Sequence, residues 1–161
     1  INKSKTDNKY KKDQFNKGNP TSLKYELNNF KVKINSADTT SFKSLKGIGS
    51  YYSNKIVKYR KALGGFTSIE QLKEVYGILP EVIDQNVNRL IVDSIDIVKV
   101  NINTCETADL KRHPYISWNI ANSIVQIRRS QEPYKTVEEI KKSDLVNDEI
   151  YRKIAPYLKT E

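Results

Sequence analysis

The chain has 161 residues, 37% of them hydrophobic, which provides the core of one ordinary domain or of two small ones. No stretch of the sequence approaches the ~20 consecutive apolar residues of a membrane-spanning helix. The formal net charge of +9 favours a polyanionic partner. Because Cys105 is the only cysteine and His113 the only histidine, the sequence excludes an internal disulfide and gives no credible zinc site.

The first 29 residues differ in composition from the rest of the chain. The chain begins at Ile1 and contains no methionine, so we expect a processed product or an excised fragment. Residues 1–29 are rich in Lys, Asn and Asp, include Gly18 and Pro20, and have few apolar residues and no period. This composition predicts a flexible basic tail or linker.

The sequence from residue 30 onward consists of two copies of one pattern. Residues 34–39 (Ile-Asn-Ser-Ala-Asp-Thr) align with residues 102–107 (Ile-Asn-Thr-Cys-Glu-Thr), a shift from 34 to 102 that equals 68 positions. The same shift, without a gap, pairs Ile56 with Ile124, Arg60 with Arg128, Glu70 with Glu138 and Leu90 with Leu158. We therefore predict two tandem domains, repeat 1 at residues 30–91 and repeat 2 at residues 92–161.

Apolar residues in each repeat recur at helical spacing in four groups that turn residues separate. In repeat 1 the breaks are Gly47-Ile48-Gly49, Gly64-Gly65 and residues 76–80. This pattern predicts about four short helices in each repeat and an all-α fold. The extended segments that precede the repeats, residues 30–34 and 91–102, could form two short strands that pair with each other.

The turn between the first two predicted helices of repeat 1 has the features of a phosphate site. Gly47 and Gly49 lack a Cβ, so they can adopt φ > 0 and let a phosphate approach the backbone closely. Ile48 between them can turn inward and hold the turn against the core. Free N–H groups and the positive end of the dipole of the helix that begins at Ser50 would point at the same place.

Basic residues flank this turn. Tyr51, Lys55 and Lys58 share one face of the second predicted helix, and Lys46 immediately precedes the turn. These lysines could neutralise neighbouring phosphates, in contacts that depend on salt and carry no base information. The alternative interpretation is a glycine-bearing turn that only connects two helices beside a solvated lysine face.

These motifs together resemble a known family. Residues 45–49 (Leu-Lys-Gly-Ile-Gly), 56–60 and 64–72 are similar to the helix-hairpin-helix repeat of ComEA-type competence proteins. The resemblance covers nearly all of residues 33–90, and a degenerate copy covers 101–158.

The resemblance implies two tandem helix-hairpin-helix domains that bind double-stranded DNA without reading its sequence, for DNA uptake or DNA handling at the cell envelope. It also implies an extracytoplasmic, membrane-tethered location, and we expect no direct membrane contact by this part of the chain. Each repeat of that family pairs two motifs, so Gly77 in the second motif is expected to add a weaker phosphate contact. The predicted DNA-binding residues are Lys46, Gly47, Ile48, Gly49, Ser50, Tyr51, Lys55, Lys58 and Gly77.

Repeat 2 departs from the pattern at its first turn, where Tyr115 replaces Gly47 and Ser117 replaces Gly49. Side chains then occupy the space that a phosphate would need, while Ile116 keeps the inward position. The net charge is +4 for residues 1–29, +5 for repeat 1 (residues 30–91) and zero for repeat 2. We therefore expect repeat 1 and the tail to hold DNA, and repeat 2 to stabilise the module or to meet a protein near Trp118.

The remaining candidate residues favour structural roles. We expect Cys105 to be a small buried residue, His113 to pack at a helix end, and Arg60 and Arg128 to pair with carbonyl or carboxylate groups at a helix end. The ten tyrosines mostly fall at helical core spacing, which does not favour a base-stacking platform. Because no nucleophile, acid–base pair or metal constellation is recognisable, we expect a binding module without enzymatic activity, cofactor or metal.

Two other functions remain open from the sequence. The module could be a rigid spacer or protein-interaction unit in an envelope assembly, or an accessory DNA-binding domain of a larger repair enzyme or nuclease. A hydrophobic anchor or a catalytic domain encoded upstream of Ile1 would distinguish these possibilities from one another.

Overall fold

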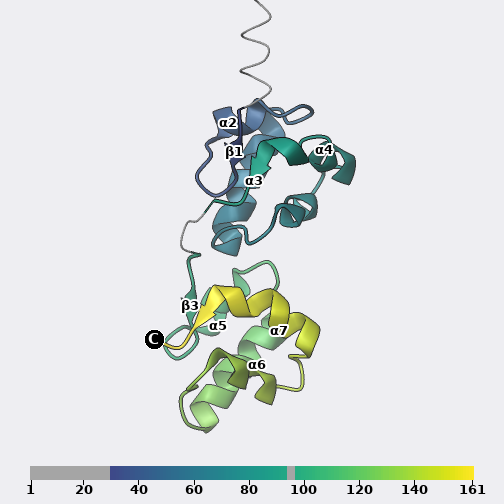
Figure 1. Cartoon of the computed structure of the whole chain (residues 1–161). Helices are drawn as coiled ribbons and strands as arrows, with labels where there is room; N and C mark the ends of the chain where they lie inside the picture. The colour runs from purple at the N-terminus through teal and green to yellow at the C-terminus, as the bar shows by residue number, and fades with distance from the viewer. Residues whose placement is uncertain (1–29, 94–96) are drawn as a thin grey trace, which may run out of the picture. The chain divides into compact units, whose positions relative to one another are not determined.

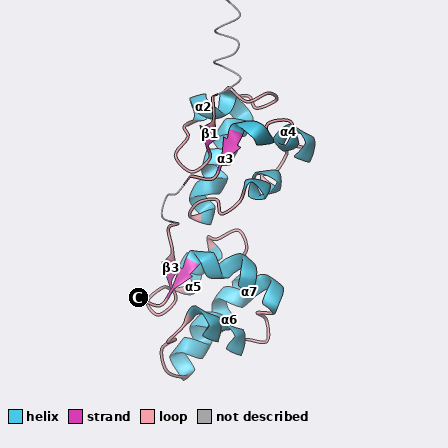
Figure 2. Ribbon diagram, viewed as in Figure 1, coloured by secondary structure: helices cyan, strands magenta, loops and turns pink. Residues whose placement is uncertain are grey.

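A computed structural model of the chain describes residues 30–93 and 97–161 (Figure 1). The predicted basic tail, residues 1–29, lies outside the described residues. Helices dominate both repeats, and short strands accompany them (Figure 2), so the predicted helical fold with two repeats is confirmed. None of the helices in the described ranges is long and apolar enough to cross a bilayer.

Corresponding elements follow one another in the two repeats. Repeat 1 contains β1 (Val32–Lys33), α2 (Thr39–Lys43), α3 (Ser50–Leu63), η1 (Ile69–Glu74), α4 (Pro80–Asp84), η2 (Val87–Arg89) and β2 (Leu90–Ile91). Repeat 2 contains β3 (Val100–Asn101), α5 (Thr107–Lys111), α6 (Trp118–Ser130), η3 (Val137–Lys142), α7 (Asp148–Ile154), η4 (Ala155–Tyr157) and β4 (Leu158–Lys159). The third predicted helix of each repeat is a 3-10 helix, η1 and η3, and a capping box opens each of them.

Short two-stranded pairings are present, and the expected pairing of the extended segments is confirmed in part. β1, from the segment 30–34, pairs in parallel with β2, whose Ile91 is the first residue of the segment 91–102. The rest of that second segment contributes β3, which pairs in parallel with β4 at the end of repeat 2. Each repeat thereby closes on its own first and last residues, which satisfies their backbone hydrogen bonds locally.

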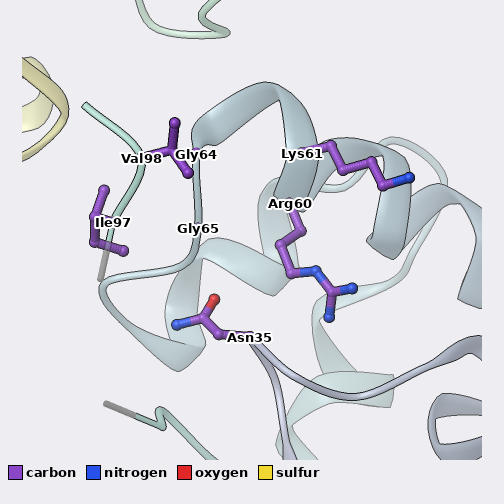
Figure 3. Close-up of a pocket in the computed structure, with 7 residues that line it drawn as sticks. All are labelled: Asn35, Arg60, Lys61, Gly64, Gly65, Ile97 and Val98. Atoms are coloured by element: carbon purple, nitrogen blue, oxygen red, sulfur yellow. The ribbon is translucent and has the colours of Figure 1, made fainter. Parts of the chain in front are cut away.

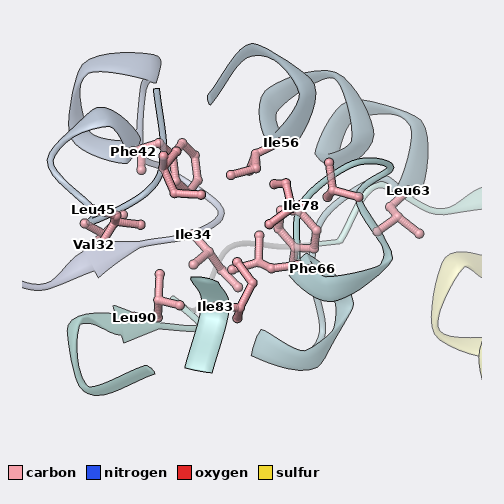
Figure 4. Close-up of a cluster of buried hydrophobic side chains, with 14 of the residues drawn as sticks. Val32, Ile34, Phe42, Leu45, Ile56, Leu63, Phe66, Ile78, Ile83 and Leu90 are labelled. Atoms are coloured by element: carbon pink, nitrogen blue, oxygen red, sulfur yellow. The ribbon is translucent and has the colours of Figure 1, made fainter. Parts of the chain in front are cut away.

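The core of repeat 1 forms where α2, α3, α4 and the turns between them converge (Figure 4). Phe42 from α2, Ile56 from α3 and Phe66 from the following turn are completely buried. Each such side chain contributes about 1.5–3 kcal/mol through burial. A second core in repeat 2 consists mainly of Ile102, Leu110, Ile116, Ala121, Ile124, Val125, Tyr134, Ile140, Val146, Ile154 and Leu158.

One arginine in each repeat donates hydrogen bonds to two backbone carbonyls near the start of that repeat. Arg60 Nη1 donates to the carbonyls of Ile34 and Ala37, at 3.0 and 2.7 Å. Arg128 makes the equivalent two bonds in repeat 2, at 2.8 and 2.6 Å. The expected carbonyl pairing of the two arginines is therefore confirmed. Cys105, the acceptor residue in the second of these repeat 2 bonds, is buried as predicted.

The segment that leads from repeat 1 to repeat 2 docks on the end of α3. Val98 N donates to the Gly64 carbonyl at 2.9 Å, and Figure 3 shows Ile97 and Val98 beside Gly64 and Gly65. A Cβ at Gly64 would lie 2.4 Å from the Val98 carbonyl oxygen, and one at Gly65 would lie 2.8 Å from Ile97 Cδ1. The glycine pair therefore allows residues 97–98 to approach the end of α3 closely. Repeat 2 has Glu132-Pro133 at the same positions.

The two repeats also contact each other through side chains, within the compact unit of residues 31–161. Gln71 Nε2 in η1 donates to the Tyr115 hydroxyl at 3.0 Å and to the Tyr157 hydroxyl at 2.7 Å. The Tyr115 hydroxyl in turn donates to the Glu74 carboxylate. Tyr157, although it belongs to repeat 2, is buried in the core of repeat 1. Repeat 2 therefore stabilises repeat 1 directly.

His113 is buried beside these tyrosines. Its ring centroid lies 4.5 Å from that of Tyr157, its side chain is only 5% exposed, and Nδ1 accepts a hydrogen bond from Tyr115 N at 3.2 Å. Nε2 has no hydrogen-bond partner among the described residues. Burial lowers the pKa of His113 from 6.5 to about 4, because the charged imidazolium is poorly solvated there.

Gly64→Ala is expected to destabilise the fold. The new methyl group collides with the Val98 carbonyl, so the free energy of unfolding should fall by roughly 1–3 kcal/mol in urea denaturation. Gly49→Ser, which copies Ser117 of repeat 2, is the matched control, because nothing lies within 4 Å of a Cβ there and serine is a favoured N-cap residue, so stability should not fall. Equal stabilities of the two variants would contradict the proposed docking of residues 97–98.

Acidification is expected to destabilise the protein through His113. The neutral imidazole is favoured in the folded state, so this contribution is complete above pH 6.5 and is lost as the pH falls through 6.5 towards 4. His113→Leu, which copies Leu45 of repeat 1, removes the titrating group. Between pH 7 and pH 5 the wild type should lose about 2 kcal/mol more unfolding free energy than the variant. Parallel pH profiles of the two proteins would refute this assignment.

Candidate nucleic-acid interface

The first turn of repeat 1 has the predicted inward residue. Ile48 is buried, and its N–H donates to the Leu45 carbonyl at 3.1 Å. Gly47 has φ +82°, a conformation that glycine adopts without steric cost. Gly49, which could also adopt a positive φ, has φ −89°. Gly49 leaves open space, because nothing lies within 4 Å of a Cβ built there.

The second turn of repeat 1 repeats this geometry. Gly77 has φ +90°, and buried Ile78 donates its N–H to the Val75 carbonyl at 3.1 Å. Gly77 is exposed, as are Gly47 and Gly49. Repeat 1 therefore presents two glycine turns of the same backbone form, each followed by the start of an α-helix.

Asn86, which the sequence interpretation did not single out, ties the first turn to the second motif. Its buried amide accepts from Lys46 N at 3.0 Å and donates to the Lys46 carbonyl at 2.8 Å and the Val82 carbonyl at 2.7 Å. The corresponding residue of repeat 2 is Ile154. The signal in the sequence was an amide residue at a position where the other repeat has an aliphatic residue of the predicted core.

The start of the helix after the turn differs between the repeats. In repeat 2 the Ser117 side chain caps α6 by accepting from Ile120 N at 3.3 Å. In repeat 1 the residue at that position is Gly49, and no side chain caps α3. The first N–H groups of the 14-residue α3 therefore remain available to an anion, and the helix dipole favours negative charge there.

The predicted lysines do not behave alike. Lys46 and Lys58 are exposed, and their ammonium groups have no ion pair or hydrogen bond to any described residue. Lys55 is half-buried, donates to the Tyr76 carbonyl at 3.0 Å, and lies 4.5 and 4.6 Å from the ring centroids of Tyr51 and Tyr76. Lys55 therefore links α3 to the second turn as well as adding positive charge. Ser50 and Tyr51 are exposed at the start of α3.

The first turn of repeat 2 keeps the inward residue and loses the open backbone. Ile116 is buried, and its N–H donates to the His113 carbonyl at 3.0 Å. Tyr115 has a negative φ and directs its hydroxyl to Gln71 and Glu74 of repeat 1. The side chain that replaces Gly47 is therefore used for contact between the repeats.

Trp118, the expected partner residue of repeat 2, is the first residue of α6 and is 54% exposed. Leu145, at the position that Gly77 occupies in repeat 1, is also exposed. Within residues 30–93 and 97–161, no group of three His, Cys, Asp or Glu residues is arranged to hold a metal ion.

The helix-hairpin-helix motif family matches the chain twice, at residues 27–91 and 96–159. These matches cover most of the chain, so the chain belongs to the helix-hairpin-helix family. Tandem motifs of this family indicate DNA binding that does not depend on base sequence.

Several proteins are similar to this chain. The human endonuclease/exonuclease/phosphatase family domain-containing protein 1 is 27% identical over 150 residues, which are 75% of this chain and 26% of the human protein. The Xenopus laevis protein of the same name is 24% identical over 145 residues, 77% of this chain and 26% of that protein. This chain therefore spans about a quarter of their length.

An uncharacterized protein of Haemophilus influenzae is 42% identical over 62 residues, which are 38% of this chain and 55% of that protein. No solved structure matches the chain.

Loss of the Lys55 ammonium group is expected to loosen the second turn. Lys55→Met keeps the aliphatic stem but removes the hydrogen bond to Tyr76 and the charge between the two rings, so the unfolding free energy should fall by about 1 kcal/mol. Lys58→Met is the control and should change the unfolding free energy by less than about 0.5 kcal/mol. A larger loss from Lys58→Met, measured by urea denaturation, would contradict the assigned role of Lys55.

Proposed function

We propose that repeat 1 binds double-stranded DNA through its backbone phosphates, at the two glycine turns and the start of α3. The observation that carries this proposal is the open, uncapped helix start at Gly49, where nothing lies within 4 Å of a Cβ and a phosphate oxygen can reach the N–H groups. The exposed ammonium groups of Lys46 and Lys58 supply additional neutralisation.

The distribution of charge supports assigning DNA binding to repeat 1. Repeat 1 has a net charge of +5 and repeat 2 a net charge of zero. Repeat 2 has capped its helix start with Ser117 and has used Tyr115 for contact with repeat 1. We infer that repeat 2 supports the DNA-binding repeat and that its exposed Trp118 is available to a protein partner.

The proposed contacts use backbone N–H and ammonium groups, which recognise phosphates and not base edges. The binding is therefore expected to be independent of sequence and to weaken steeply with salt. We further propose that the protein acts as a binding module without catalysis of its own.

For the biological role, we propose DNA reception for uptake or handling at the cell envelope, with the chain held outside the cytoplasm. The similarity of residues 45–49, 56–60 and 64–72 to ComEA-type competence proteins supports this role.

A second candidate role is that of a DNA-binding region within a larger DNA-processing enzyme. The specific observation in its favour is the alignment with about a quarter of the human and Xenopus laevis proteins, whose names include an endonuclease/exonuclease/phosphatase family domain. The gene sequence beyond both ends of this chain tests the two roles. A membrane anchor, together with recovery of the protein in the envelope fraction, supports DNA reception, and a catalytic domain supports the enzyme.

Gly49→Leu is expected to abolish most of the DNA binding while preserving the fold. Gly49 has an ordinary φ and nothing lies within 4 Å of a Cβ there, so a side chain can begin without a clash, and leucine would occupy the place of the phosphate. Affinity for a duplex, measured by fluorescence anisotropy at several salt concentrations, should fall at least about tenfold, which corresponds to about 1.4 kcal/mol. Circular dichroism and thermal melting verify the fold.

Ser117→Leu at the matching position of repeat 2 is the control for that experiment. It removes the cap of α6 and should lower stability by about 1 kcal/mol, yet leave duplex affinity unchanged. The proposed site is wrong if folded Gly49→Leu binds duplex DNA as tightly as the wild type.

A further inference from the structure

Two tyrosines of repeat 1 lie outside the core that their spacing predicts. Tyr51 is 66% exposed and Tyr76 is 86% exposed. Both lie beside the proposed phosphate sites, Tyr51 in the first turn of α3 and Tyr76 immediately before Gly77. Exposed aromatic rings next to a phosphate site offer flat surfaces on which a nucleobase can stack.

Lys55 holds both rings in place. Its ammonium group lies over the two ring faces and also donates to the Tyr76 carbonyl at 3.0 Å. The Tyr76 backbone and ring therefore each have a contact with Lys55 before any ligand arrives, which lowers the entropic cost of stacking against the ring.

A hollow of about 250 Å³ opens beside Tyr76. It is lined by Lys55, Lys58, Tyr59, Ala62, Val75 and Tyr76. The Tyr59 hydroxyl donates to the Glu74 carboxylate at 2.7 Å, so the polar end of that side chain already has a partner. Aromatic and aliphatic walls with two ammonium groups suit a flat, uncharged ring that is joined to a negative charge, as a nucleobase is joined to its phosphate.

Repeat 2 shows that the fold does not require this cluster. At the positions of Tyr51, Lys55 and Tyr76, repeat 2 has Asn119, Ser123 and Asp144. At the positions of Lys58 and Tyr59 it has Gln126 and Ile127. The residues of this cluster are thus present only in the repeat that has the glycine turns, which favours a role in binding.

We propose that the hollow beside Tyr76 receives an unpaired DNA base, so that the protein prefers a duplex with an unpaired extension to a blunt duplex. The proposal rests on the proposed phosphate contacts of repeat 1, which place the backbone of the same nucleotide at the Gly77 turn. A paired base remains stacked inside the duplex and cannot reach the ring, so an unpaired nucleotide is the occupant that fits.

The test compares two DNA molecules of the same duplex sequence, one blunt and one with a short single-stranded extension that contains 2-aminopurine. Stacking of one base on an aromatic side chain is worth about 1–3 kcal/mol, so the wild type should bind the extended duplex at least about fivefold more tightly. The fluorescence of 2-aminopurine should also be quenched on binding, because the base stacks on a tyrosine.

Tyr76→Ala should remove both the preference and the quenching while leaving the affinity for blunt duplex within about twofold. The Tyr76 ring is exposed, so this variant keeps its core. Trp118→Ala, which removes an exposed aromatic ring from repeat 2, is the matched control and should retain the preference and the quenching.

Equal binding of both DNA molecules by the wild type overturns the proposal and leaves the duplex-binding function intact. A preference that survives Tyr76→Ala also overturns it. If the wild type binds neither DNA, the duplex-binding function itself fails, and the proposal fails with it.

Discussion

The inward aliphatic side chain of each helix-connecting turn is the constraint on which the rest of the structure depends. Ile48, Ile78, Ile116 and Val146 are all buried, and each donates its N–H to the carbonyl three residues earlier, at 2.9–3.1 Å. Burial of that side chain fixes the turn against its own core. The residues before and after it differ among the four turns, so these positions can change without loss of the fold.

The two repeats have used this freedom differently. Repeat 1 retains Gly47, which has a positive φ and approaches Val82 closely, and Gly49, which leaves the start of α3 open. Repeat 2 has Tyr115 and Ser117 there, and these side chains make the contact with repeat 1 and the cap of α6. The same turn therefore provides a ligand site in one copy and a structural contact in the other.

The sequence predicted the features that arise from local patterns, namely the offset of 68 positions, the helical spacing and the inward isoleucines. It did not predict contacts between residues far apart in the chain, such as Asn86 with Lys46 or Tyr115 with Gln71, because periodicity contains no information about which surfaces meet. The pairing of β3 with β4 was not predicted, for the same reason. Lys55 lies on the helix face that the sequence predicted. Its contact with Tyr76 was not predicted, because spacing on a helix does not show which other segment packs against that face.

The contact between the repeats connects these observations. On η1, Gln71 donates hydrogen bonds to tyrosines of repeat 2 and Glu74 accepts one, and η1 ends immediately before Val75, Tyr76 and the Gly77 turn. From the opposite side, Lys55 of α3 holds the Tyr76 carbonyl. The second glycine turn is therefore fixed by α3 and by a segment that repeat 2 holds in place. Repeat 2, which lacks glycines at its own turns, thus contributes to the geometry of the Gly77 turn of repeat 1. This matters because a phosphate site made of backbone N–H groups is only as well ordered as the backbone that carries it.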